Sequence, residues 1–466
     1  MKIDRLKAYW QIFCLVWPLA FGMVNTAVLQ LIDRAMLARE SMLSLEAVLP
    51  ASVLAWTFLG FFQSLVGYSG VFVAQYHGRG DTRGVYLTYR TAMRLAVFSG
   101  LAALALIPVA RLVLAGFNPS PELLAAENAY CGIFLAGSFF VCAQMAAAAY
   151  FTGCGRTPIV FWTGLLGNVL NGLLDALLIF GFSFTIAART FQIPAWGIRG
   201  AAIATVISLA VQGAILAVAV RRDLRRRQES LKLTGSERDA AGWVLGRILR
   251  YGLPSGGYAV LNLLSFTIFV FITGQQEGVA FAASNACFTI NYLLFSPMEG
   301  FALGAQTLVG QHLGRNDAVG AARAARQTAF LAILLVLIPS VLTVVFYRPI
   351  LELFAPADQA TAETFITLGR SLILLMSAWL FFDAISSVTA GALKGAGDTR
   401  FVFIWTLLIA FGFWLPLVWY VSRGTTSMTA LWQTIIYYTF LTALGLVLRW
   451  KCGKWRAHRL LDGNKR

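Results

Sequence analysis

The sequence predicts an all-α integral membrane protein with twelve transmembrane helices, arranged as two six-helix bundles that repeat in parallel. Three observations support this: the composition, the spacing of the apolar stretches, and an internal repeat. Of the 466 residues, 58% are hydrophobic and only 12% are charged. A soluble protein carries roughly 25% charged residues, so much of this chain's surface is expected to face hydrocarbon.

The apolar stretches are long enough to cross a bilayer, which takes about 20 residues in a helix. Short polar breaks separate twelve of them, at residues 10–33, 47–75, 92–115, 125–150, 158–183, 197–220, 248–273, 280–310, 324–346, 362–390, 401–421 and 427–449. We therefore expect an N-terminal lobe (1–220), a basic cytoplasmic linker (221–247), a C-terminal lobe (248–450) and a cytoplasmic tail (451–466).

The basic residues predict the orientation. The chain has 37 Lys and Arg against 21 Asp and Glu, a net charge of +16. If the N-terminus is cytoplasmic, the other side keeps only Arg34, Arg39, Arg111, Arg189, Arg199, Arg348, Arg370 and Arg423. Such a bias follows the positive-inside rule, so both termini are expected in the cytoplasm. Topology accounts for the basicity, and no nucleic-acid partner is expected.

An internal repeat divides the chain into halves. Residues 73–81 (VAQYHGRGD) match 309–317 (VGQHLGRND), and the same offset places Pro18 on Pro254. A second match joins 151–157 (FTGCGRT) to 393–399 (LKGAGDT). Because each half holds six spans and both copies of each motif fall on the same side, the halves are expected to have the same orientation, as in many secondary transporters.

Acidic residues inside the spans are the main functional candidates, because an ionisable group in hydrocarbon costs roughly 2.5–3.5 kcal/mol on insertion scales. Four acids fall there: Asp33, Asp175, Glu299 and Asp383. The repeat places Phe269, Leu417, Gln63 and Val141 opposite them, so the acids break the symmetry. We interpret this as a sign that the acids serve something other than packing.

Asn168, Asn171 and Asp175 follow a spacing that puts all three on one face of a helix. Such a face suits Na⁺, which prefers oxygen ligands, or a proton held on Asp175. The alternative is hydrogen bonding between packed helices. For Asp33 the alternative is a surface pair with Arg34. Glu299 comes just after Pro297. For Glu299 the two interpretations are that its side chain lines the cleft or that it does not.

Other chemistry is weakly represented. An intramembrane enzyme would need a set such as HExxH or a nucleophile with its base, and no span contains one, so no enzyme activity, cofactor or metal other than Na⁺ is expected. Several aromatic residues could stack on an organic cation, although aromatic stripes in membrane proteins usually pack or face lipid. These are Trp56, Phe61, Trp162, Tyr258, Tyr292, Trp379 and Trp414.

Over nearly all its length, the chain resembles the multidrug and toxic compound extrusion (MATE) transporters. The motifs that carry the resemblance occur in the expected order, in or beside the expected spans. They are 28–36 (VLQLIDRAM), 167–175 (GNVLNGLLD), 200–205 (GAAIAT), 309–317 (VGQHLGRND), and Asp383 followed by 391–400 (GALKGAGDTR).

The resemblance implies an antiporter that exports organic, often cationic, compounds in exchange for H⁺ or Na⁺. In the DinF-like branch the coupling ion uses an N-lobe pocket, and that motif matches Asp33, Asn171, Asp175 and Thr205. In the NorM-like branch a C-lobe acid matches Asp383, but the Glu of span seven is Asn262 here. Either Glu299 replaces that charge or this chain lacks the C-lobe cation site.

Small organic substrates and membrane lipid are thus the expected partners, and a monomer is the expected state. The alternative is a flippase for lipid-linked precursors, which has related lobes. A flippase is expected to have a basic, anion-binding cleft. Here the intramembrane charges are acidic, while Arg and Lys are assigned to the loops.

Overall fold

The computed structural model describes residues 2–117, 119–186, 189–226, 235–276, 278–356, 358–424, 427–458 and 460–461. Its first half contains α1 (Lys2–Glu40), α2 (Met42–Gly67), α3 (Ser69–Arg79), α4 (Thr82–Ala105), α5 (Ile107–Ala115), α6 (Pro121–Ala136), α7 (Ser138–Gly153), α8 (Thr157–Phe180), β1 (Phe182–Ile186), β2 (Arg189–Ile193) and α9 (Ile198–Arg226). Its second half contains α10 (Gly235–Thr273), α11 (Val279–Gly314), α12 (Ala318–Val345), α13 (Tyr347–Glu352), α14 (Gln359–Ala396), α15 (Thr399–Leu407), the π-helix η1 (Leu408–Trp414), α16 (Leu415–Gly424), α17 (Met428–Lys451) and the 3₁₀ turn η2 (Lys454–Ala457).

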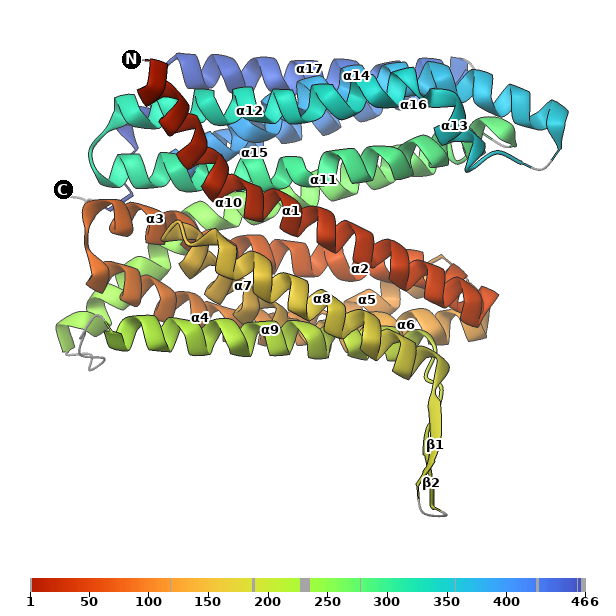
Figure 1. The fold of residues 1–466 in the computed structure, drawn as a ribbon, viewed down its shortest axis with the longest axis horizontal. Coiled ribbons are helices and arrows are strands. Elements are labelled where there is room, and N and C mark those ends of the chain that lie inside the picture. Colours follow the sequence, from red (N-terminus) through yellow and green to blue (C-terminus); the bar gives the residue numbers. More distant parts are fainter. Residues whose placement is uncertain are drawn as a thin grey trace. The chain divides into compact units, whose positions relative to one another are not determined.

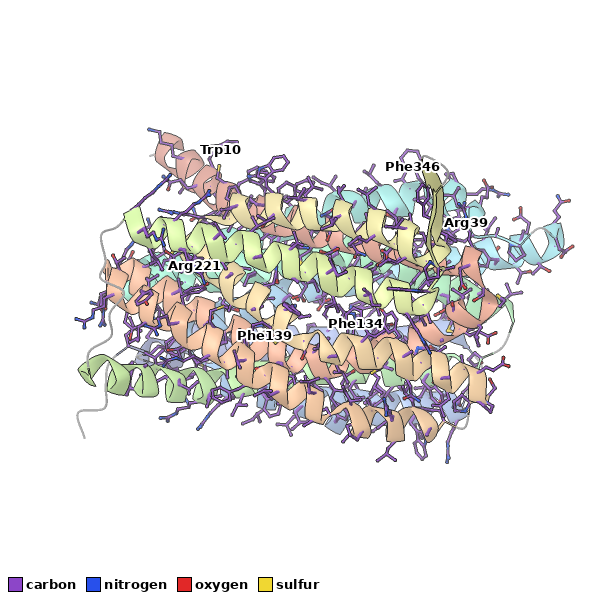
Figure 2. All side chains as sticks on the ribbon, turned by 90° about the horizontal axis from the view of Figure 1, so that it is seen from below. Trp10, Arg39, Phe134, Phe139, Arg221 and Phe346 are labelled. Atoms are coloured by element: carbon purple, nitrogen blue, oxygen red, sulfur yellow. The ribbon has the colours of Figure 1, made fainter. Side chains whose placement is uncertain are left out.

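The helices confirm the predicted membrane-spanning architecture. Among the described residues, 11 helices are long and apolar enough to cross a membrane, or 12 when a bent pair counts as one span. That pair is α6 and α7, which meet at Gly137 with a bend of 44°. Large apolar side chains such as Trp10 and Phe346 lie exposed on the outside of the helices (Figure 2). Such a surface suits a lipid environment.

A β-hairpin interrupts the all-helical pattern between α8 and α9. Strands β1 and β2 pair antiparallel with Phe182 opposite Ile193 and Ile186 opposite Arg189, and the hairpin projects from the end of α8 (Figure 1). The predicted fifth window, 158–183, runs into the first strand and is therefore too long by a few residues. Phe, Thr and Ile, which dominate both strands, favour extended backbone once the apolar helix has ended.

The chain forms two compact units, which we describe separately. The N unit is residues Asn25–Gly256, and the C unit is Met1–Val24 together with Gly257–Arg466. These limits differ from the predicted lobes because the first part of α1 belongs to the C unit and the first part of α10 to the N unit.

Close packing explains why the start of α1 belongs to the C unit. A Cβ at Gly300 of α11 would overlap the backbone of Ala20, so only glycine allows α1 and α11 to approach this closely. Val16 and Ala20 of α1 are buried in the core of the C unit, which includes Phe269 and Trp432. Farther along the same helix, Leu37 lies in the core of the N unit with Phe134.

The predicted linker is mostly helical where it is described. Helix α9 continues to Arg226 and α10 begins at Gly235, so the apolar windows 197–220 and 248–273 understate both helices. Residues 227–234 lie outside the described residues, as do 459 and 462–466 of the predicted tail. Helices with charged ends extend beyond the apolar core of a bilayer, which hydropathy windows do not capture.

The internal repeat recurs in the local structure. Asp81 caps α4 by accepting a hydrogen bond from the Gly84 amide at 2.8 Å, and Asp317 caps α12 by accepting one from the Gly320 amide at 2.7 Å. The residue before each aspartate has a positive φ, 78° at Gly80 and 59° at Asn316. Glycine and asparagine tolerate this left-handed conformation, so the second copy keeps the turn without a glycine.

Candidate functional site

The polar face predicted on α8 lies inside the N unit. Asn171 is 1% exposed and Asp175 is 0% exposed. The Asn171 Nδ2 group donates a hydrogen bond to Asp175 Oδ2 at 2.6 Å. The amide therefore orients one oxygen of this carboxyl group and leaves the other for a different partner.

Helix α1 brings a second acid to the same place. Asp33 is half-buried and lies within hydrogen-bonding reach of the Asp175 carboxyl group. Asp33 also interacts electrostatically with the exposed Arg34, so the alternative of a pair with Arg34 holds alongside the contact with Asp175. Two carboxylates so close repel one another unless a proton or a cation lies between them.

Several polar atoms of this cluster are buried without a hydrogen-bond partner among the described residues. They are Asp33 Oδ1, Asp175 Oδ1 and Asn168 Nδ2. Buried carboxylate oxygens are costly to leave unpaired. Two oxygen acceptors close together are suitable ligands for a proton or for Na⁺, whereas the Asn168 amide nitrogen can only donate.

Two residues in the N unit differ from the expectation. The Thr205 hydroxyl of α9 donates to its own helix, to the Ala201 carbonyl at 3.0 Å, and within the described part of the chain it makes no hydrogen bond to the acids. Conversely, Tyr130 of α6 is buried and interacts electrostatically with both Asp33 and Asp175. The sequence carried no signal for Tyr130, because only packing decides which face of α6 meets α1 and α8.

The candidate residues of the C unit form a second cluster. The Ser386 hydroxyl donates to Asp383 Oδ1 at 3.1 Å on α14. Glu299 of α11 interacts electrostatically with Asp383, so the two predicted acids belong to one site. Asn262 of α10 takes part through its Oδ1, which accepts a hydrogen bond from Tyr438 at 3.5 Å, and its Nδ2 donates to the Tyr258 carbonyl at 2.9 Å.

Lys394 corrects the expectation that basic residues are confined to loops. It lies in the last turn of α14, half-buried, with its Nζ 4.6 Å from the centre of the Tyr258 ring. Glu299 is its electrostatic partner. Lys394 lies on the same face of α14 as Asp383, because a separation of 11 residues is close to three turns. The C-unit cluster therefore holds two acids and one base.

Most of the aromatic candidates lie outside the two acidic clusters. Trp162 and Tyr292 are 60% and 40% exposed, Trp56 packs against Phe134, and Phe61 against Phe62. In the C unit Trp379 packs beside Phe266. Tyr258 belongs to the acidic cluster, and Trp414 reaches it by stacking on Tyr438, with ring centres 4.3 Å apart.

Known proteins of similar sequence are named as probable multidrug resistance proteins. The probable multidrug resistance protein NorM of Thermotoga maritima is 27% identical, over 84% of this chain and 81% of its own length. The protein of the same name from Rhizobium meliloti is 24% identical, over 92% of this chain and 88% of its own.

Solved structures share the fold. A MOP superfamily transporter from Pyrococcus furiosus superposes with a TM-score of 0.82 at 18% identity, covering 96% of this chain and 97% of that one. A crystal structure of MATE in the straight conformation gives a TM-score of 0.81 at 19% identity, with the same coverage.

The family assignment rests on a match along both halves of the chain. The MatE family model matches residues 18–177 and 254–420, and thus covers the four acids of both clusters. This confirms the resemblance found in the sequence motifs: the chain belongs to the MatE family of membrane transporters.

Proposed function

We propose that this protein is a multidrug efflux transporter that exports organic, often cationic, compounds by alternating access in exchange for H⁺ or Na⁺. The observation that carries the proposal is the close pair Asp33 and Asp175, each with a buried oxygen that has no hydrogen-bond partner among the described residues. The names of the NorM relatives, which describe multidrug resistance, support the choice of substrate. We place the protein in the bacterial plasma membrane as a monomer with both termini in the cytoplasm.

In this mechanism Asp33, Asp175 and Asn171 hold the coupling ion. With both carboxyl groups ionised, their repulsion favours uptake of a proton or Na⁺ between them. The Asn171 amide keeps the Asp175 carboxyl group in position by its 2.6 Å hydrogen bond. Asn168 lies on the same helical face, one turn away, and supplies a further polar group. Thr205 is included among these residues only because it matches the family motif.

The C-unit cluster is proposed to serve an organic cation. Asp383 and Glu299 supply negative charge, and the Tyr258 and Tyr438 rings supply faces on which a cation can stack. Glu299 thereby takes the place of the charge that Asn262 lacks. Export is coupled to ion entry if the ion and the substrate bind best to different states of the transporter, because the binding of one then favours release of the other.

The test uses efflux of a cationic dye from vesicles that contain the purified protein, driven in separate experiments by a pH gradient and by a Na⁺ gradient. We expect Asp33→Asn and Asp175→Asn to abolish gradient-driven efflux while the protein remains folded in the membrane. The control is Glu363→Gln, which removes a carboxylate whose side chain is 55% exposed at the start of α14.

Two results would contradict the proposal in different ways. If both aspartate variants export dye at the wild-type rate under the same gradient, the N-unit pair does not couple transport. If wild-type protein moves no cationic dye under either gradient, the exporter function itself is wrong, and transport of a lipid-linked precursor becomes the next assay.

A further inference from the structure

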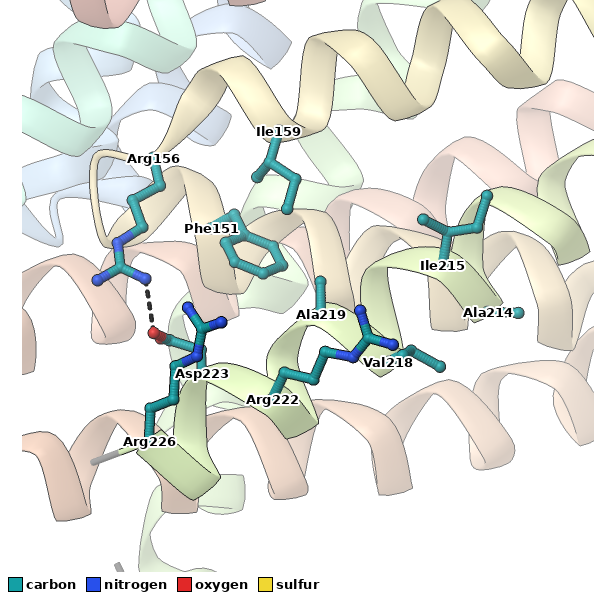
Figure 3. Close-up of a pocket in the computed structure, with 10 residues that line it drawn as sticks. All are labelled: Phe151, Arg156, Ile159, Ala214, Ile215, Val218, Ala219, Arg222, Asp223 and Arg226. Atoms are coloured by element: carbon teal, nitrogen blue, oxygen red, sulfur yellow. Dashed lines mark hydrogen bonds and ion pairs between the residues drawn. The ribbon is translucent and has the colours of Figure 1, made fainter. Parts of the chain in front are cut away.

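A hollow in the N unit, distinct from both acidic clusters, opens beside the charged end of α9. Its volume is about 530 Å³. Helices α7, α8 and α9 and the turn between α7 and α8 form its walls (Figure 3), which consist of Phe151, Arg156, Ile159, Ala214, Ile215, Val218, Ala219, Arg222, Asp223 and Arg226.

The lining has a basic part and an apolar part. Arg156 and Arg226 lie at one end of the hollow, while Ala214 and Ile215 lie at the other (Figure 3). From Ala214 to Arg226 the helix rises about 18 Å, at roughly 1.5 Å per residue. The apolar part thus follows α9 into the region that faces hydrocarbon, and the basic part lies where the span ends.

Of the three arginines that line the hollow, two are available to bind an anion. Asp223 accepts from Arg156 Nη1 and from the Tyr150 hydroxyl, both at 2.6 Å. The charge of Asp223 is therefore matched by Arg156. Arg222 and Arg226 are exposed, and among the described residues neither has an ion-pair partner. The hollow consequently carries an excess positive charge that an anion can balance.

We propose that this hollow is a binding site for one anionic phospholipid. The phosphate lies between the guanidinium groups of Arg222 and Arg226, and an acyl chain lies along Phe151, Ile159 and Val218. Arginine suits this role because its planar group bonds phosphate oxygens through two N–H groups at once. Basic pockets between helices near a membrane surface select acidic headgroups. A free phosphate ion would leave the apolar wall uncovered, so we assign the site to a lipid.

The test does not depend on transport. Purified full-length protein in detergent is titrated with phosphatidylglycerol or with phosphatidylcholine of the same acyl chains, and bound lipid is counted by native mass spectrometry. We expect wild type to prefer phosphatidylglycerol, and Arg222→Gln with Arg226→Gln to weaken its binding about tenfold or more, because two charges near the headgroup are lost.

The matched control is Arg221→Gln with Arg225→Gln. These residues are exposed on the same helix but do not line the hollow, so this pair removes the same charge and is expected to keep the preference. An equal loss in both double variants would mean general attraction to the charged helix end and would overturn the proposal.

A second variant tests the apolar part with the charges intact. Ala219→Phe places a ring in the hollow and is expected to displace phosphatidylglycerol without affecting binding of glycerol phosphate, which has no acyl chain. If glycerol phosphate competes with the lipid at equal concentration in wild type, the site recognises phosphate alone and the lipid assignment is wrong. If wild type does not distinguish the two lipids, the proposal also fails.

Discussion

Arg449 holds Asp398 by two hydrogen bonds, from Nε to Oδ2 at 2.6 Å and from Nη2 to Oδ1 at 3.2 Å. In the N unit, Arg156 donates to Asp223 at 2.6 Å. Asp398 and Arg156 occupy matched positions in the repeated motif, so this motif is tied to α9 in the N unit and to α17 in the C unit. The acid and the base have exchanged places between the two copies, which leaves the structural role intact.

The Asp398 pair is expected to stabilise the C unit. The Asp398 side chain is 4% exposed and that of Arg449 is 21% exposed. Removing one partner of such a buried pair costs about 3 kcal/mol. Asp398→Asn should therefore lower the melting temperature of the protein in detergent. Glu363→Gln, which removes a partner of the exposed Arg348, should leave it unchanged; equal effects of the two variants would contradict this.

The same pair predicts a pH dependence at acid pH. Burial alone would raise the pKa of Asp398, but hydrogen bonds from His458 and Arg449 outweigh it and hold the pKa below the ordinary 3.8. A carboxyl group with a lowered folded-state pKa stabilises the protein above the unfolded-state pKa, and this stability is lost as the pH falls through the folded-state value.

The measurement is the difference in melting temperature between wild type and Asp398→Asn from pH 7 to pH 3. The difference should be constant above about pH 5 and shrink below about pH 4. A difference that instead declined between pH 7 and pH 5 would assign the effect to another group, such as the neighbouring His458.

Position 391 on α14 is expected to accept only glycine, because α11 packs closely against it. A Cβ there would overlap the Ala302 carbonyl oxygen, and backbone cannot shift as a flexible side chain can. Gly391→Ala should destabilise the protein by about 1–3 kcal/mol. Gly132→Ala on α6, where a Cβ meets no atom within 4 Å, is the control. A stable, fully folded Gly391→Ala protein would show that the helices are farther apart.

Asn171 and Thr205 are expected to differ in their effect on ion coupling. Asn171→Ala removes the hydrogen bond to Asp175, and bonds to charged groups are worth about 1.5–3 kcal/mol. The ion concentration for half-maximal efflux should therefore change about tenfold or more. It should rise for Na⁺, because the carboxylate is no longer held in position, and fall for H⁺, because a carboxylate that has lost a donor binds a proton more tightly. Thr205→Ala removes a bond to the Ala201 carbonyl of its own helix, and we expect a change below about threefold. The reverse order would place Thr205, rather than Asn171, at the ion.

Lys394 is expected to limit the charge of the substrates that bind near Glu299. Its ammonium group already lies over the Tyr258 ring at 4.6 Å. Lys394→Met should strengthen binding of a dicationic dye more than that of a monocationic dye, because it removes a positive charge from the cluster. Arg400→Met removes an exposed charge nearby and serves as the control. An unchanged ratio of the two affinities would show that Lys394 does not face the substrate.

By itself, the sequence determined the class of protein, the number of spans, the repeat, and which acids were worth attention. These follow from composition and periodicity, since a bilayer requires long apolar helices and penalises buried charge. The sequence also placed Asn171 and Asp175 on one face of α8, because helical geometry is local.

Tertiary structure alone decided how residues distant in the chain meet. Asp33 reaches Asp175, Tyr130 joins them, and Lys394 covers Tyr258, because packing selects one face of each helix from several that are nearly equally apolar. The same holds for α1, whose start packs in the C unit because Gly300 permits a close approach. Hydropathy records how apolar a segment is, whereas packing depends on shape, which a single sequence does not reveal.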